Sequence, residues 1–239
     1  EVVCLARTPA KLADRPWFSK VEVVQADLLE SANLAPALAG CDAAYYLVHS
    51  MGGGEGFEDA DRRAALNFAT ASEASGIDRI IYLGGLGSDD ETLSSHLASR
   101  HEVGDALAST SVPVIEFRAA VIIGSGSVSF EMLRHLTQVL PAMTTPKWVR
   151  TYCQPIAIRD VLAYLVAALD DDTNGHTVYE IGGPDVLTYE DMMQTYASVA
   201  GLPKRLILPV PVLSPGLSSL WIGLVTPLPV NIARPLVDS

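Results

Sequence analysis

The hydrophobic positions of the chain form two alternating kinds of segment. Short runs of consecutive apolar residues predict buried strands, and longer segments with apolar residues three or four positions apart predict helices between them. The predicted strands cover residues 2–6, 21–27, 43–48, 80–83, 114–118 with 121–123, and 178–181. Near-continuous apolar strands separated by helices are typical of a parallel sheet that is covered on both faces. The pattern therefore predicts an α/β fold.

Glycine and threonine mark the ends of two of the predicted helices. Gly76 is placed to cap the C-terminus of one helix, and Thr188 is a good N-cap for another. The predicted helices cover residues 29–38, 57–75, 94–109, 161–169 and 189–200. The alternation loosens after about residue 140. We therefore expect a main α/β domain over residues 1–140 and a smaller C-terminal lobe, interleaved with the sheet, over residues 141–239.

Composition and charge narrow the class of protein. Hydrophobic residues make up 49% of the chain and charged residues 18%, which suits a well-buried globular core. The formal net charge of −12 argues against a nucleic-acid partner, although it leaves room for a local cationic pocket. Cys4, Cys41 and Cys153 have no metal-binding spacing. They are expected to be reduced thiols in a cytoplasmic protein, most simply buried as small hydrophobic side chains.

The segment from Leu206 to Val230 carries no charge and is long enough to cross a bilayer. Five prolines interrupt it, however, and proline breaks helices. A broken apolar segment in a soluble lobe is the better interpretation, with weak membrane-surface contact through residues 206–230 as a further possibility.

Ligands of a doubly wound sheet bind at the carboxyl ends of its strands, so the residues that follow each strand are candidates. Arg7 stands where the ribose 2′ position of a dinucleotide is read, and an arginine there favours NADP over NAD. Asp27 is suited to accept a hydrogen bond from the adenine amine, or to cap a helix. Gly84 and Gly85 would permit the close approach of a cofactor, or would simply form a turn. His49 is more often a structural residue than a catalytic one.

The strongest candidates for catalytic residues are His96 and Arg100, which are four residues apart and would share one face of a helix. An imidazole can exchange a proton near neutral pH, and a guanidinium can hold a ribose or phosphate. The alternative is a solvated helix face on which Arg100, His101 and Glu102 are simply exposed.

The order of these segments resembles the extended and atypical short-chain dehydrogenase/reductase superfamily, and in particular its NmrA-like, NAD(P)H-binding, epimerase/dehydratase-like branch. The resemblance covers nearly the whole chain. It rests on residues 3–7, 24–27, 46–51, 65–67, 81–86, 117–124, 154–157 and 179–184.

The resemblance implies a doubly wound Rossmann fold and a bound NADP(H). It implies that Arg7 and Asp27 contact the adenosine half of the cofactor. It also implies that the segment His49-Ser50-Met51 and the pair Gly84-Gly85 pass along the cofactor. The C-terminal lobe would close over a pocket for a small-molecule substrate near Arg118 and the residues up to Gly126, and Arg118 is also a candidate cofactor-binding residue.

The sequence departs from the family in two ways. The first strand and its glycine-rich loop are missing, so we expect an interrupted sheet and a fragment of a longer protein. In addition, His96 and Arg100 replace the tyrosine and lysine that active members use, and Arg100 cannot relay a proton as a lysine does. The expected function is an NADP-dependent oxidoreductase- or epimerase-like protein of unidentified substrate. The alternative is a non-catalytic NADP(H)-binding redox sensor or structural subunit.

Overall fold

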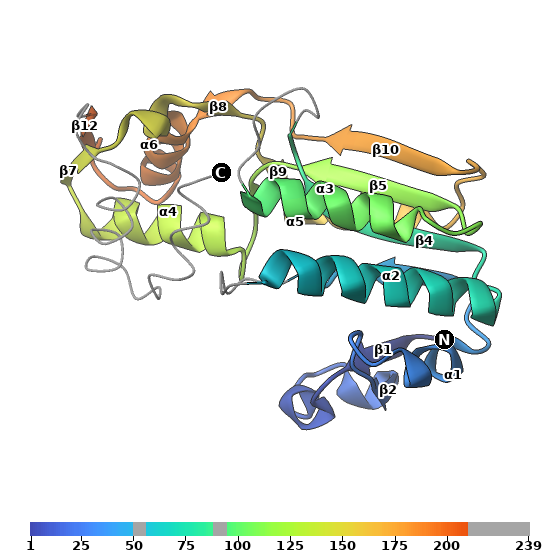
Figure 1. The fold of residues 1–239 in the computed structure, drawn as a ribbon. Coiled ribbons are helices and arrows are strands. Elements are labelled where there is room, and N and C mark those ends of the chain that lie inside the picture. The colour runs from blue at the N-terminus through green and yellow to red at the C-terminus, as the bar shows by residue number, and fades with distance from the viewer. Residues whose placement is uncertain (50–55, 88–94, 210–239) are drawn as a thin grey trace.

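A four-stranded parallel sheet forms the centre of the computed structural model, which describes residues 1–49, 56–87 and 95–209 (Figure 1). Its strand order is β10-β5-β4-β3. These strands are β3 (Ala43–Tyr46), β4 (Arg79–Gly85), β5 (Val114–Ala119) and β10 (His176–Ile181). Every pair is parallel, with Ile81 opposite Ile115 and Tyr179 opposite Phe117.

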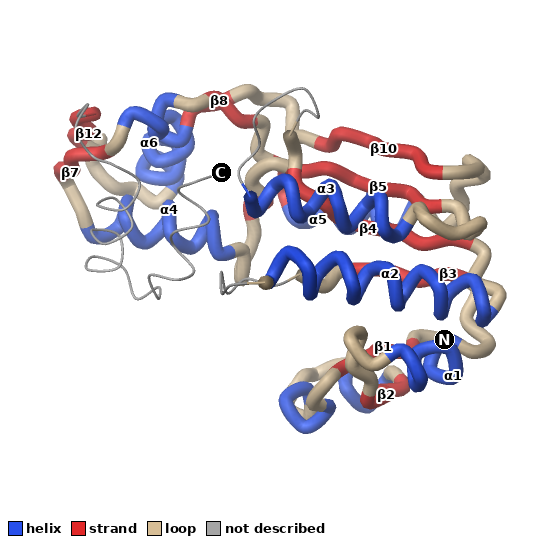
Figure 2. Tube along the Cα trace, in the orientation of Figure 1, coloured by secondary structure: helices blue, strands red, loops and turns tan. Residues whose placement is uncertain are grey.

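Helices cover both faces of this sheet. The helices α2 (Phe57–Ser75) and α3 (Ser95–Leu107) lie on one face, and α5 (Ile158–Ala167) lies on the other (Figures 1 and 2). On the first face Tyr46 and Tyr82 pack with Phe68 of α2 and Leu107 of α3. The core of the opposite face contains Ile81, Ile115, Phe117, Val161 and Leu165. The predicted doubly covered parallel sheet is therefore confirmed.

A separate parallel pair, β1 (Val3–Ala6) and β2 (Glu22–Gln25), shares no backbone hydrogen bonds with the larger sheet. The expected interruption of the sheet lies here. The pair is attached instead through α1 (Leu34–Leu38), which packs on α2. Side chains of α2 strengthen this attachment, because Asn67 donates to the Leu28 carbonyl and Ser75 to the Ala35 carbonyl. The unit also contains the 3₁₀ turns η1 (Pro9–Leu12), η2 (Phe18–Lys20) and η3 (Ser31–Asn33).

The C-terminal lobe has a hydrophobic core of its own, rich in methionine. Its elements are α4 (Val128–Val139), β7 (Ala142–Thr145), η4 (Lys147–Arg150), β8 (Tyr152–Cys153), β11 (Leu187–Thr188), α6 (Tyr189–Val199) and β12 (Leu206–Pro209). The core includes Met132, Leu136, Met143, Met192 and Ile207. Thus α4 packs in the lobe although it precedes residue 140. The short parallel pair β6 (Ile122–Ile123) and β9 (Ile156–Ala157) leads from the main sheet toward the lobe.

Most predicted elements are present, and the differences have local causes. Residues 29–38 form only a short α1 preceded by a 3₁₀ turn, because Pro36 is tolerated only in a first helical turn. The strand β4 continues through Gly85 instead of ending at Leu83. Both predicted caps are confirmed. Gly76 adopts a φ of 73° at the end of α2, and Thr188 forms a capping box with Asp191.

The charge-free segment that begins at Leu206 enters the lobe as strand β12, which pairs in parallel with β7. Its remaining residues, 210–230, lie outside the described ranges. Within the described ranges, no helix is both long and apolar enough to span a bilayer.

Candidate functional site

The carboxyl ends of the parallel strands point toward the C-terminal lobe (Figure 1). This edge collects most of the candidates: Arg7 follows β1, Asp27 follows β2 by one residue, and His49 follows β3. Gly84 and Gly85 end β4, and Arg118 is the penultimate residue of β5. Ser50 and Met51 lie outside the described residues.

Arg7 and Asp27 are placed at the ends of two neighbouring strands. Arg7 is exposed. Oδ1 of Asp27 accepts a hydrogen bond of 3.0 Å from the Leu29 backbone N–H, which closes a turn directly after β2. Asp27 therefore does not cap a helix, and Oδ2 has no hydrogen-bond partner among the described residues. An exposed guanidinium beside a carboxylate is a suitable donor and acceptor set for a phosphorylated ribose and an adenine amine.

Gly84 and Gly85 lie close to neighbouring side chains of the protein. A Cβ atom on Gly84 would lie 3.2 Å from both Oε1 of Glu116 and Cε1 of Tyr82. A Cβ atom on Gly85 would lie 2.7 Å from Cδ2 of Leu97, which is closer than carbon atoms approach one another. The contacts of Gly84 restrict a larger residue there, whereas Leu97 can turn its side chain away from position 85. The predicted place of both glycines along the cofactor stays a prediction.

A buried charged cluster lies beneath α3. The side chain of Glu116 is fully buried, and its Oε1 accepts a hydrogen bond of 2.7 Å from Nε of Arg118, which is itself 9% exposed. Its Oε2 lies 2.9 Å from Nε2 of His176 on β10. Gly104 of α3 leaves the space that this carboxylate occupies, since a Cβ there would overlap Oε2 of Glu116 and lie 2.9 Å from its Cδ. Arg118, predicted as a cofactor or pocket residue, is thus held by an internal ion pair.

The helix α3 carries both His96 and Arg100, as the spacing predicts, although the side chain of His96 lies outside the described set. Arg100 is partly buried, and its carbonyl accepts a hydrogen bond of 3.0 Å from the Tyr82 hydroxyl. Burial raises the pKa of Tyr82 to about 12, and the charge of Arg100 opposes that rise. His101 is buried, with Nε2 3.4 Å from the Gly85 carbonyl. The alternative of a wholly solvated helix face is therefore wrong, since only Glu102 of the three residues is exposed.

The roles of Glu116, His176 and Gly104 were not predicted from the sequence. A signal for Glu116 was present, because a carboxylate inside the apolar run from Val114 to Phe117 must be buried and therefore paired. The partner on β10 is distant in sequence and has no local signal. Within the described residues, no cluster of histidine, cysteine and carboxylate side chains could hold a metal ion.

One family of known proteins matches the N-terminal part of the chain. Residues 1–112, which include β1 to β4 and α3, match the family described as NAD(P)H-binding. This part of the chain, which is less than half of the 239 residues, is similar to that family. The match agrees with the NAD(P)H binding that the sequence resemblance implies, since that binding is the property by which the matched family is described.

Known proteins extend the similarity beyond residue 112. A mitochondrial subunit of Arabidopsis thaliana, NADH dehydrogenase [ubiquinone] 1 alpha subcomplex subunit 9, is 30% identical over 160 residues, which are 65% of this chain. The chain spans only 40% of the length of that relative. Triphenylmethane reductase of Citrobacter sp., solved with NADP(H), has a TM-score of 0.75 at 16% identity and covers 99% of this chain and 79% of its own. The quinone oxidoreductase QOR2 of Escherichia coli, solved with NADPH, has a TM-score of 0.75 at 20% identity. The match covers 99% of this chain and 77% of the QOR2 chain. At these identities the two structures establish the fold alone.

Proposed function

We propose that this protein binds NADP(H) at the carboxyl edge of its strands, in preference to NAD(H). The observation that carries the proposal is the pair of groups at the ends of β1 and β2. Arg7 is exposed there, and Asp27 keeps one carboxylate oxygen available. A guanidinium suits the ribose 2′-phosphate that distinguishes NADP from NAD, and a carboxylate suits the adenine amine. The two similar structures solved with NADP(H) add support.

The residues on the larger sheet suit the other half of the cofactor. His49 at the end of β3 and the turn after Gly85 would lie along it, and the C-terminal lobe would close over its nicotinamide end. A bound NADPH would supply a hydride for reduction of a small-molecule substrate. The protein's own contribution would be orientation, since Glu116 fixes Arg118 and Tyr82 fixes the backbone of α3 at Arg100.

Nucleotide titration tests this proposal. The protein is expressed from its whole reading frame, and NADPH and NADH are titrated by calorimetry into the wild type and into Arg7→Ala. Loss of one charged hydrogen-bonded contact is worth about 1.5–3 kcal/mol, so NADPH is expected to bind roughly tenfold or more weakly to the variant while NADH changes little. An unchanged preference would remove Arg7 from the site.

A second candidate function is a non-catalytic NADP(H)-binding subunit or redox sensor. It is favoured by the replacement of the tyrosine and lysine pair by His96 and Arg100, because a permanently charged guanidinium cannot relay a proton. Turnover separates the two. An enzyme should oxidise NADPH with a carbonyl or quinone acceptor and lose that activity in His96→Ala. NADPH binding without turnover on a broad panel of acceptors would favour the subunit or sensor.

A further inference from the structure

The surface of α2 contains a hollow, and none of the predicted site residues lines it. Its walls are Asp59, Arg62, Arg63 and Leu66, and its volume is about 350 Å³. Both arginines are exposed, and Leu66 is partly buried against the core beneath α2. Two guanidinium groups beside one apolar wall form a surface suited to a phosphorylated aromatic ligand.

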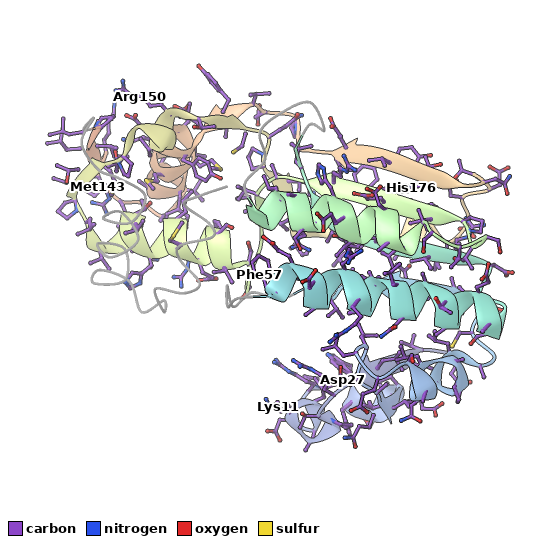
Figure 3. All side chains as sticks on the ribbon, in the orientation of Figure 1. Lys11, Asp27, Phe57, Met143, Arg150 and His176 are labelled. Atoms are coloured by element: carbon purple, nitrogen blue, oxygen red, sulfur yellow. The ribbon has the colours of Figure 1, made fainter. Side chains whose placement is uncertain are left out.

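The contacts of α2 place this hollow beside the end of β2. Nδ2 of Asn67 donates a hydrogen bond of 2.8 Å to the carbonyl of Leu28, the residue that follows Asp27. Arg63 is one helical turn before Asn67, so it lies on the same side of α2. Leu28 and Leu66 also pack against the same core cluster. Figure 3 shows the labelled Asp27 next to α2, with Lys11 farther out in the same N-terminal unit. Arg63 therefore lies on the side of α2 that faces the residues after β2.

Charges of both signs lie around this hollow. The exposed cations are Arg7 and Lys11 after β1 and Arg62 and Arg63 on α2. The first turns of the same helix also carry the carboxylates Glu58, Asp59 and Asp61. Arg62 pairs with Asp59 at 4.0 Å, and since both side chains are more than half exposed this pair is weak and can be exchanged for a ligand. No carboxylate of the described residues forms an ion pair with Arg63.

We propose that Arg63, assisted by Arg62, determines specificity for NADP(H) by binding the 2′-phosphate of the adenosine ribose from the side of α2, opposite Arg7. This inference rests on the proposed nucleotide function and adds residues to it. Arginine binds a phosphate through two parallel N–H donors, and two arginines on opposite sides would enclose it. Leu66 would provide an apolar wall for the adenosine.

The test uses 2′,5′-ADP and 5′-ADP as probes, because they differ only in the 2′-phosphate. Each is titrated by calorimetry into the wild type, Arg63→Ala, Asp59→Asn and the control Arg150→Ala. Arg150 is a matched control, since it is also an exposed arginine in a weak ion pair, at 3.5 Å from Glu190, and it lies in the distant C-terminal lobe (Figure 3). Circular dichroism confirms that each variant keeps its fold.

We expect Arg63→Ala to bind 2′,5′-ADP about tenfold more weakly, while its affinity for 5′-ADP changes less than about twofold. Asp59→Asn should bind 2′,5′-ADP more tightly, because it releases Arg62 from its carboxylate, and Arg150→Ala should match the wild type. Unchanged binding in Arg63→Ala overturns the inference while leaving the NADP(H) function intact. An equal loss for both probes also overturns it, because Arg63 would then bind the 5′-phosphate. A wild type that binds neither probe overturns both proposals.

Discussion

Replacing Gly104 by alanine should destabilise the protein, although alanine is the better helix former. In a helix interior alanine is favoured over glycine by about 0.8–1 kcal/mol. At this position the added Cβ would overlap Oε2 of Glu116 and lie 2.9 Å from its Cδ, and the carboxylate cannot move without weakening its bonds to Arg118 and His176. Overpacking of a tight core costs about 1–3 kcal/mol, and the displaced ion pair adds to that cost. We therefore expect a net loss of about 2 kcal/mol.

The effect of Gly104→Ala on the free energy of unfolding should change from destabilising to stabilising when the Glu116 carboxylate is removed. In a Glu116→Ala background with Arg118→Met, which eliminates the unpaired buried charge, Gly104→Ala fills vacated space and should stabilise by about 1 kcal/mol. The effects of Gly104→Ala in the wild type and in this background then differ by about 3 kcal/mol, which is the coupling energy of the mutant cycle. The free energies of unfolding are measured in urea at about pH 7.5. Glu102→Ala, on the exposed face of α3, serves as the control and should change stability by less than about 0.5 kcal/mol. Equal effects of Gly104→Ala in both backgrounds would refute the reasoning.

Two further predictions concern hydrogen bonds with a pH signature. Thr188→Ala should cost about 1 kcal/mol at pH 7, because it removes the capping box of α6. The hydrogen bonds from Thr188 lower the pKa of Asp191, so the stability that they supply is present above the unfolded pKa, near 4, and is lost as the pH falls through the lowered folded value. The difference between wild type and variant in urea unfolding should therefore shrink in acid, and a constant difference would contradict the assignment. Tyr82→Phe should cost about 1 kcal/mol at neutral pH, because it removes the hydrogen bond from the Tyr82 hydroxyl to the Arg100 carbonyl. Burial raises the pKa of Tyr82 to about 12, so the folded wild type keeps a proton that the unfolded chain releases from pH 10 upward, and its stability should fall between pH 10 and 12. The variant lacks this decline, so parallel pH dependences of the two proteins would be the contrary result.

The fold was predictable because its strands are local apolar runs with strong boundary residues. The run from Ala43 to Val48, the αL glycine at Gly76 and the cap at Thr188 each carry a signal within a few residues. The separation of the β1–β2 pair from the main sheet agrees with the interrupted sheet that the resemblance implied. The short length of α1 was not predicted, because the helical spacing of residues 29–38 was given more weight than the helix-breaking Pro36.

The candidate site was only partly predictable. Arg7 and Asp27 follow strands, so topology alone brings them to one edge. The buried cluster of Glu116, Arg118 and His176 depends on two strands that are neighbours in the sheet but lie about 60 residues apart in sequence. The position of Arg63 depends on how α2 packs against the residues after β2, where Asn67 donates to the Leu28 carbonyl. The pattern of hydrophobic positions does not predict this contact. Contacts of this kind arise from packing between elements, whereas sequence patterns describe the elements themselves.

The most direct test of the account is the affinity of the wild-type protein, expressed from its whole reading frame, for NADPH and for NADH, measured side by side under the same salt conditions. An NADP(H) site built around Arg7 predicts saturable binding of both dinucleotides, with NADPH bound roughly tenfold or more tightly. Binding of NADH equal to or tighter than that of NADPH, or no binding of either, would contradict it.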